Sequence, residues 1–154
     1  MAPDILTPGT FTPEVIEAWE ISCQCYFMHK STPAAVQVRT VVWSIQDPKV
    51  RNWYQVNQAR ISSLSFDEYM SELRTVCLLL DWAAGVLKKI FNSKQGSRPF
   101  CDWAIECQSQ NCLLRGTAFH LNDILMKCLL ENNMDDGLAL DYYYENITEE
   151  DVTQ

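Results

Sequence analysis

Glycine and histidine are scarce in this sequence, which has five glycines and two histidines among its 154 residues. The glycines form no phosphate-binding loop, and neither the serine-hydrolase elbow nor the paired-histidine zinc motif occurs. Acid–base chemistry would therefore depend on His29 or His120, and a single histidine is more often a surface or boundary residue. We expect no enzyme and no cofactor; a small helical enzyme with an unfamiliar site is the weakest of three hypotheses.

Long apolar runs and a disulfide pattern are missing as well. No run approaches the ~20 residues that cross a bilayer, and the first residues lack the basic and then apolar order of a signal peptide. The seven cysteines are irregularly spaced, which is typical of small core residues in a reducing compartment. Cys25 and His29 would share a helix face but supply only two ligands, so no metal site is predicted. We expect a cytoplasmic or nuclear protein without membrane contact.

Basic residues are absent from the last part of the sequence. Eight of the 20 acidic residues lie between Glu131 and Gln154, and the other 12 balance the 12 Lys and Arg, so the net charge of −8 belongs to this acidic end. The one local concentration of basic residues, a candidate contact cluster, consists of Lys88, Lys89, Lys94 and Arg98. A solvated helix end is the commoner role of such a group. Because nucleic-acid binding needs clustered Lys and Arg, we expect nucleic acid to bind only weakly or through other segments.

Helix signals follow one another along the chain. Helix starts are predicted at Thr12, Thr32, Asp47 and Ser65, where a capping side chain precedes a proline or a capping-box acid. The helix from Ser65 is the most periodic, with apolar residues at helical spacing through Leu80. Further helices are predicted at 81–91, 99–113, 117–131 and 135–144.

The same periodicity predicts which residues are buried. In the helix from Thr32 they are Val38, Val42 and Ile45. In the helix 117–131 the apolar stripe consists of Leu121, Ile124, Leu125, Cys128 and Leu129. Since no strand-like alternation occurs, the fold class is all-α, in two small helical lobes. Asn, Ser, Gly and Pro together break the pattern after residue 92, which divides the chain into lobes 1–92 and 93–145 and an acidic tail 146–154.

The break itself contains Gln95-Gly96, followed by Pro99-Phe100 and then by Asp102-Trp103. Gly96 permits a tight turn that a side chain would obstruct. The Gln95 amide offers donors and an acceptor that can tie the turn to the following helix. Phe100 and Trp103, one helical turn apart, would anchor that helix in the core. An ordinary loop followed by an amphipathic helix is the alternative interpretation.

This stretch resembles the major homology region of retroviral and retrotransposon Gag capsid proteins, which begins with Gln-Gly and continues through two aromatics one helical turn apart. The preceding segment from Asp47 to Trp82 is similar to the Gag pattern of gypsy-type LTR retrotransposons, in which a tryptophan-bearing helix precedes an aromatic-x-x-aromatic helix. The resemblance covers roughly residues 12–144. The interval between Gly96 and Phe100 is one residue shorter than in the retroviral form. Cys107 lies near the position where an arginine usually completes the motif's hydrogen bonds.

The resemblance implies a structural capsid protein that associates with itself into a shell around the element's RNA, through ring contacts of the first lobe and paired contacts of the second. The basic tail or zinc knuckle with which the family captures RNA is missing. The alternative is a domesticated capsid-derived module that dimerises or binds partner peptides. Its groove in the first lobe would be lined by Tyr26, Phe27, Trp43 and Tyr54, although core positions are the commoner role for such residues.

Overall fold

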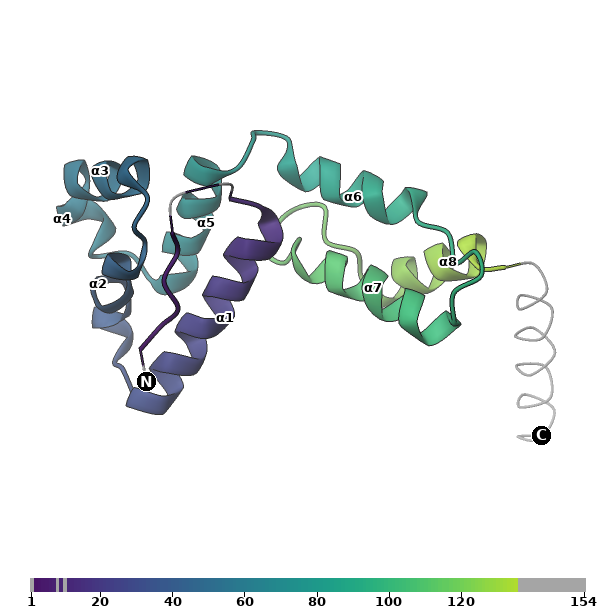
Figure 1. The fold of residues 1–154 in the computed structure, drawn as a ribbon, viewed down its shortest axis with the longest axis horizontal. Coiled ribbons are helices and arrows are strands. Elements are labelled where there is room, and N and C mark those ends of the chain that lie inside the picture. Colours follow the sequence, from purple (N-terminus) through teal and green to yellow (C-terminus); the bar gives the residue numbers. More distant parts are fainter. Residues whose placement is uncertain (1, 8, 10, 136–154) are drawn as a thin grey trace. The chain divides into compact units, whose positions relative to one another are not determined.

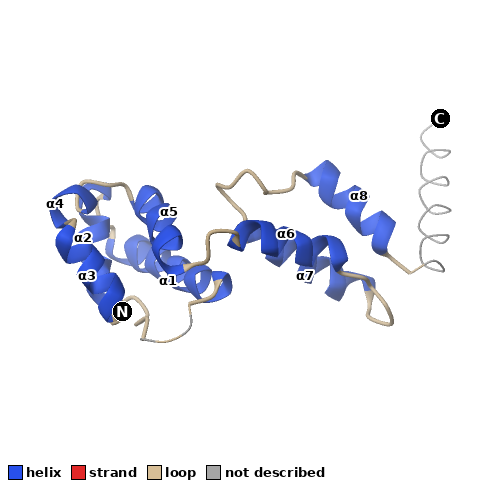
Figure 2. Ribbon diagram, turned by 90° about the horizontal axis from the view of Figure 1, so that it is seen from above, coloured by secondary structure: helices blue, strands red, loops and turns tan. Residues whose placement is uncertain are grey.

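The computed structural model describes residues 2–7, 9 and 11–135, and helices dominate this part of the chain (Figure 1 and Figure 2). Eight α-helices and two 3₁₀ helices follow one another, and the β-type pairing within the described residues is limited to a bridge between Leu6 and Ile45. The prediction of an all-α fold is confirmed. None of the helices described is both long and apolar enough to cross a membrane.

Contacts along the chain divide it into two compact units, Met1–Trp82 and Ala83–Gln154, here called unit 1 and unit 2. The sequence placed a lobe boundary between residues 92 and 93, whereas this division falls between residues 82 and 83. Helix α6 (Trp82–Asn92) falls almost wholly in unit 2, where Ile90 lines a small cleft together with Cys107 of α7 (Phe100–Cys112). The Asn, Ser, Gly and Pro of the break therefore form a turn inside one unit. The assignment of the units to capsid lobes stays a prediction.

Helix α1 (Pro13–Lys30) begins where the sequence predicts. The Thr12 hydroxyl accepts a hydrogen bond from the Val15 N–H, and Pro13 occupies the first helical position, where its missing N–H has no helical partner to lose. The helix ends at Ser31, whose φ of 49° lies in the left-handed region. Its buried face consists of Ile16, Trp19, Cys23 and Phe27.

The predicted helix from Thr32 is instead three short pieces: a 3₁₀ helix η1 (Ala34–Val36), α2 (Gln37–Val41) and a 3₁₀ helix η2 (Val42–Ser44). Thr32 does not cap them, because Pro33 is the residue before η1 and makes no side-chain cap. Stiff β-branched residues crowd this segment, and they favour continuous helix less than unbranched ones. The predicted buried residues Val38, Val42 and Ile45 are buried all the same.

The third predicted helix is divided at Asn57 into α3 (Pro48–Val56) and α4 (Gln58–Ile61). Asp47 caps α3, as expected, and the Trp53 carbonyl accepts from both the Asn57 side chain at 3.0 Å and the Asn57 backbone N–H at 3.2 Å. Helix α5 (Phe66–Cys77) has the predicted Ser65 cap. It ends before Leu80, which is fully exposed, so the predicted stripe is too long.

The core of unit 1 is one apolar cluster of 16 buried residues from α1, α2, α3, α4, α5 and the segments between them. Aromatic rings meet edge to face within it, as between Phe27 and Phe66 with centroids 4.9 Å apart. Trp19 is buried at its centre and donates its indole N–H to the Asp4 carbonyl and the Ser44 hydroxyl.

Unit 2 contains α6, α7 (Phe100–Cys112) and α8 (Asp123–Asn133). Helix α7 lies within a residue of its predicted bounds. Helix α8 begins six residues after the predicted start at Thr117, because Asn122 caps it by accepting from the Leu125 N–H at 2.8 Å. Its predicted stripe is mostly wrong. The buried face consists of Met126, Leu129, Leu130 and Asn133, whereas Ile124, Leu125 and Cys128 are exposed. The predicted helix 135–144 and the acidic tail lie outside the described residues beyond Asp135.

Candidate functional site: the Gln95 turn

The loop between α6 and α7 contains the motif on which the sequence interpretation depends. Gly96 has a φ of +59°, in the left-handed region that glycine adopts without penalty. A Cβ built at Gly96 would meet nothing within 4 Å, so the predicted steric obstruction is wrong. Glycine is favoured at this position because of its positive φ, and not because a side chain would clash with a neighbour.

Gln95 is buried, with 6% of its surface exposed, and all its polar groups are used. Its side-chain N–H donates to the Arg98 carbonyl at 2.9 Å, just before α7, which is the tie that the sequence predicted. Its side-chain oxygen accepts from the Asp135 N–H at 2.9 Å, and its own N–H donates to the Asn133 carbonyl at 3.3 Å. One side chain therefore fixes the turn to the start of α7 and to the end of α8.

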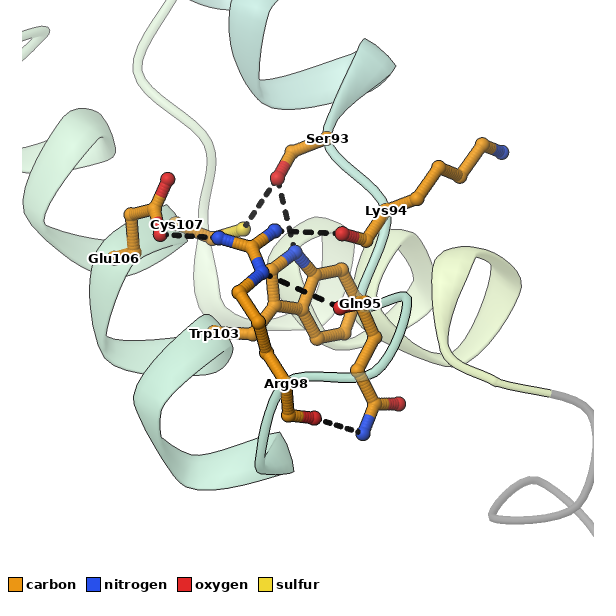
Figure 3. Close-up of polar contacts among 7 residues, drawn as sticks. All are labelled: Ser93, Lys94, Gln95, Arg98, Trp103, Glu106 and Cys107. Atoms are coloured by element: carbon orange, nitrogen blue, oxygen red, sulfur yellow. Dashed lines mark hydrogen bonds and ion pairs between the residues drawn. The ribbon is translucent and has the colours of Figure 1, made fainter.

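Arg98 closes the turn from outside (Figure 3). Its guanidinium donates through Nε to the Gln95 carbonyl at 3.3 Å and through Nη2 to the Lys94 carbonyl at 2.6 Å, and Nη1 pairs with the Glu106 carboxylate of α7. The sequence placed Arg98 in a candidate contact cluster and noted the lack of an arginine at Cys107. In the structure Arg98 supplies a guanidinium to the motif's own carbonyls, and its charge is compensated there.

Trp103 is the anchor that the sequence predicted. Its side chain is fully buried, and its indole N–H donates to the Ser93 hydroxyl at 2.9 Å. Phe100 is half-buried and meets Trp103 edge to face at 5.9 Å. Asp102 is exposed in the first turn of α7, where it faces the positive end of the helix dipole and takes no part in the network. Cys107 is a buried core residue whose thiol donates to the Ser93 hydroxyl, and burial raises the pKa of this thiol.

Asn133 is the part of the site that the sequence analysis missed. Its side-chain N–H donates to the Phe91 carbonyl of α6 at 3.0 Å, and its side-chain oxygen accepts from the Lys94 ammonium at 2.9 Å. Asn133 is four residues beyond Leu129 and so falls on the buried face of α8. An asparagine among the apolar residues of a helix face indicates a buried side-chain hydrogen bond. The sequence analysis missed this signal because it assigned the buried face of the helix to other residues.

The four residues predicted to line a groove in unit 1 differ in how deeply they are buried. Phe27 and Tyr54 are core residues, whereas Tyr26 is half-buried beside Phe27 and Trp43 is 65% exposed with its ring edge-on to Tyr54 at 5.9 Å. Tyr26 and Phe27 are neighbours on α1, whereas Trp43 of η2 packs against Tyr54 of α3. Unit 1 does have a pocket of about 590 Å³ at another place, between the start of α1, the start of α3 and the end of α5. It is lined by Gly9, Phe11, Thr12, Pro13, Asp47, Lys49, Val50, Val76, Cys77, Leu78, Leu79 and Trp82.

Both histidines lie at exposed positions of the fold. His29 is exposed in the last turn of α1, and Cys25, its predicted neighbour on the helix, is exposed as well. His120 is exposed, with Nε2 3.4 Å from the Asn111 side-chain nitrogen. Over residues 2–7, 9 and 11–135, no group of three or more His, Cys, Asp or Glu side chains is placed to hold a metal ion.

The polar atoms of the Gln95 turn form hydrogen bonds that hold neighbouring backbone segments together. Its carbonyls accept from Arg98, its amide oxygen from Asp135 and its serine hydroxyl from Trp103 and Cys107. Such a site ties the turn to the start of α7 and to the end of α8. No protein-family model, curated protein or solved structure matches this chain.

Proposed function

We propose that the chain is a structural, capsid-type protein of an LTR retrotransposon that associates with itself into a shell around the element's RNA. The proposal is supported chiefly by the Gln95 turn. The resemblance implies a structural motif made of a Gln-Gly turn and two aromatic residues. In this chain Gln95 bonds to the segments before α7 and after α8, and Trp103 is fully buried.

A braced unit suits repeated assembly. A closed shell places many copies in nearly identical contacts, so each copy must present the same rigid surfaces, and each contact can be weak because number and symmetry supply the avidity. Unit 2 carries a surface of this kind on α8, where Ile124 is 73% exposed and Leu125 52% exposed. Exposed apolar side chains that adjoin on one helix face are typical of protein contact surfaces.

Electron microscopy together with light scattering, over rising protein concentration and salt, tests the proposal directly. Salt screens the repulsion between acidic copies, so discrete shells or tubes are expected to grow with both variables. A chain that remains a monomer or dimer throughout would contradict the proposal.

A matched pair of variants separates assembly from folding. Ile124→Ser with Leu125→Ser removes exposed apolar surface from α8 and is expected to reduce assembly without lowering the melting temperature. Val56→Ser, at an 84% exposed position of α3, is the control and is expected to change neither. Equal assembly of both variants would show that α8 is not a contact surface.

A partner-binding module is the second candidate, because the pocket of unit 1 is apolar and of the size that holds a few side chains. Leu79 lines it and is 79% exposed, so Leu79→Glu can be made without disturbing the core. A persistent monomer that binds apolar peptides, and that loses this binding in Leu79→Glu, would favour the module over the shell.

A further inference from the structure

Helix α1 carries apolar side chains on two opposite faces. One face, which includes Trp19, packs into the core of unit 1. On the opposite face, exposed apolar residues recur at the spacing i, i+3, i+7 and i+10, which is the spacing of a heptad seam. They are called here the α1 outer stripe and are Ala18, Ile21, Cys25 and Met28. The helix therefore presents one apolar face to the core and a second one, on which Met28 is 81% exposed, to the surface.

Helix α5 shows that the core of unit 1 does not require a second apolar face. It packs its apolar residues into the same core, and its exposed face is polar. The exposed residues of α5 are Asp67, Glu68, Ser71 and Thr75. A helix that borders one core needs one apolar face, whereas a helix that is apolar on opposite faces is typically covered on both sides. We therefore expect the α1 outer stripe to have a partner.

The two ends of α1 carry opposite charges, which indicate what this partner is. Glu14, exposed in the first turn, precedes Ala18 by four residues and extends the face of the stripe. His29, exposed in the last turn, follows Cys25 by four residues, and the basic Lys30 comes next. When two copies of α1 lie antiparallel, the acidic first turn of each lies beside the basic last turn of the other, and the helix dipoles oppose each other. A parallel pair would instead bring the two Glu14 side chains together.

We infer that the α1 outer stripe binds the same stripe of a second copy of this chain, in an antiparallel pair with twofold symmetry. The heptad spacing then places position 18 of one copy opposite position 28 of the other, and position 21 opposite position 25. The stripe runs over about 15 Å of helix. Because so short a contact buries less than the ~1,200 Å² of a stable interface, the pair forms only at raised concentration. This inference holds whether or not the chain assembles into shells.

Sedimentation equilibrium of the full chain, over rising concentration, tests the pairing. Ile124→Ser with Leu125→Ser serves as the parent, so that the surface of α8 does not contribute, and dimers are expected. Adding Ile21→Ser with Met28→Ser is expected to raise the dissociation constant at least tenfold, because a symmetric pair loses each side chain twice.

The matched control for this experiment adds Val56→Ser with Leu80→Ser to the same parent. It removes two exposed apolar side chains elsewhere in unit 1 and is expected to leave the dissociation constant unchanged. A parent that stays monomeric throughout, or equal weakening in both variants, would overturn the inference. Melting temperatures equal to that of the parent show that the variants are folded.

Disulfide cross-linking under a mild oxidant tests the orientation. Ala18→Cys with Met28→Cys is made in a chain whose exposed cysteines are removed by Cys25→Ser, Cys101→Ser and Cys128→Ser. The antiparallel pair is expected to link position 18 of one copy to position 28 of the other, as identified by mass spectrometry of the digested dimer. Within one copy these positions are about 15 Å apart, too far for a disulfide. Val56→Cys in place of Met28→Cys is the control and is expected to give no such link. Links from 18 to 18 and from 28 to 28 would indicate a parallel pair, and the inferred arrangement would then be wrong.

Discussion

The two units fill their interiors in different ways. Unit 1 has an apolar cluster of 16 buried residues with several aromatic contacts. The three buried polar side chains in the described part of the chain, Gln95, Asn111 and Asn133, all belong to unit 2. Each bonds a backbone segment far along the chain: Gln95 the end of α8, Asn133 the end of α6, and Asn111 the loop before α8. The described part of unit 2 thus holds its loops with side-chain amides, where a larger core would hold them by packing.

One feature is common to both units, and it makes the comparison testable. Each has a fully buried tryptophan whose indole N–H donates to a serine hydroxyl: Trp19 to Ser44 at 3.1 Å, and Trp103 to Ser93 at 2.9 Å. The same truncation in the two units therefore removes the same chemistry from different surroundings.

The largest effect is expected for Trp103→Ala, which removes the central side chain of unit 2 at a cost of about 3–5 kcal/mol. Because Trp103 is the only buried aromatic side chain among the described residues of unit 2, we expect this unit to unfold while unit 1 keeps its own melting transition. Trp19→Ala is the matched variant and is expected to destabilise unit 1 without abolishing its fold. Calorimetry that shows one unchanged cooperative transition for Trp103→Ala would contradict the assignment of Trp103 as the anchor.

Asn111→Ala is expected to cost about 3 kcal/mol, because it leaves two buried backbone groups of Leu121 without partners. The Asn111 side chain accepts from the Leu121 N–H at 2.8 Å and donates to its carbonyl at 2.9 Å. Denaturant unfolding of unit 2 measures the loss, and Gln108→Ala, on the exposed side of α7, is the control. Equal stability of the two variants would show that amides do not hold this unit.

Gly96→Val is expected to cost about 1–2 kcal/mol, since a β-branched residue is strained at the φ of +59°. Gly96→Asn distinguishes backbone strain from crowding. Asparagine tolerates the left-handed region, and a Cβ meets no neighbour here, so we expect a much smaller loss. Equal losses for both would indicate crowding and not torsion. Thermal melting with the oligomeric state measured alongside distinguishes loss of fold from loss of assembly.

The smallest effect concerns alkaline pH and unit 1. Burial raises the pKa of the Cys23 thiol to about 12 and that of Cys77 to about 11, from 9.0 when unfolded. A folded pKa raised above the unfolded one gives stability that is complete below pH ~9 and is lost as the pH rises toward the folded values. We expect each of the two thiols to lower the stability of unit 1 by about 1 kcal/mol between pH 9 and pH 10. Cys23→Ala should weaken this dependence, and an unchanged slope would contradict it.

The sequence revealed local features of the fold and missed those that depend on distant partners. Thr12, Asp47 and Ser65 were predictable as caps because each bonds an N–H three residues away. The start of α8 was not predictable, because Asn111 holds Leu121 outside the helix from ten residues earlier. When a polar side chain bonds the backbone of an apolar residue, that residue can lie outside the helix even though its spacing is helical.

The same limit applied to the Gln95 turn. Its tie to Arg98 and the burial of Trp103 follow from residues within ten positions of each other. The bonds of Gln95 to Asp135 and of Lys94 to Asn133 span about 40 residues, and no local pattern announces them. The basic residues that the sequence grouped together have different surroundings in the structure. Arg98 belongs to the Gln95 turn, whereas Lys88 and Lys89 are exposed.

The bond pair between Asn111 and Leu121 has a practical consequence for engineering. These two hydrogen bonds join the ends of the loop 112–120 directly. We therefore expect the positions of the helices on either side to be insensitive to the length of this loop. The entropy of closing a loop grows only slowly with its length. An epitope or a small fluorescent reporter inserted at the exposed Ala118 should therefore leave α7 and α8 in place, giving a labelled chain without touching either terminus.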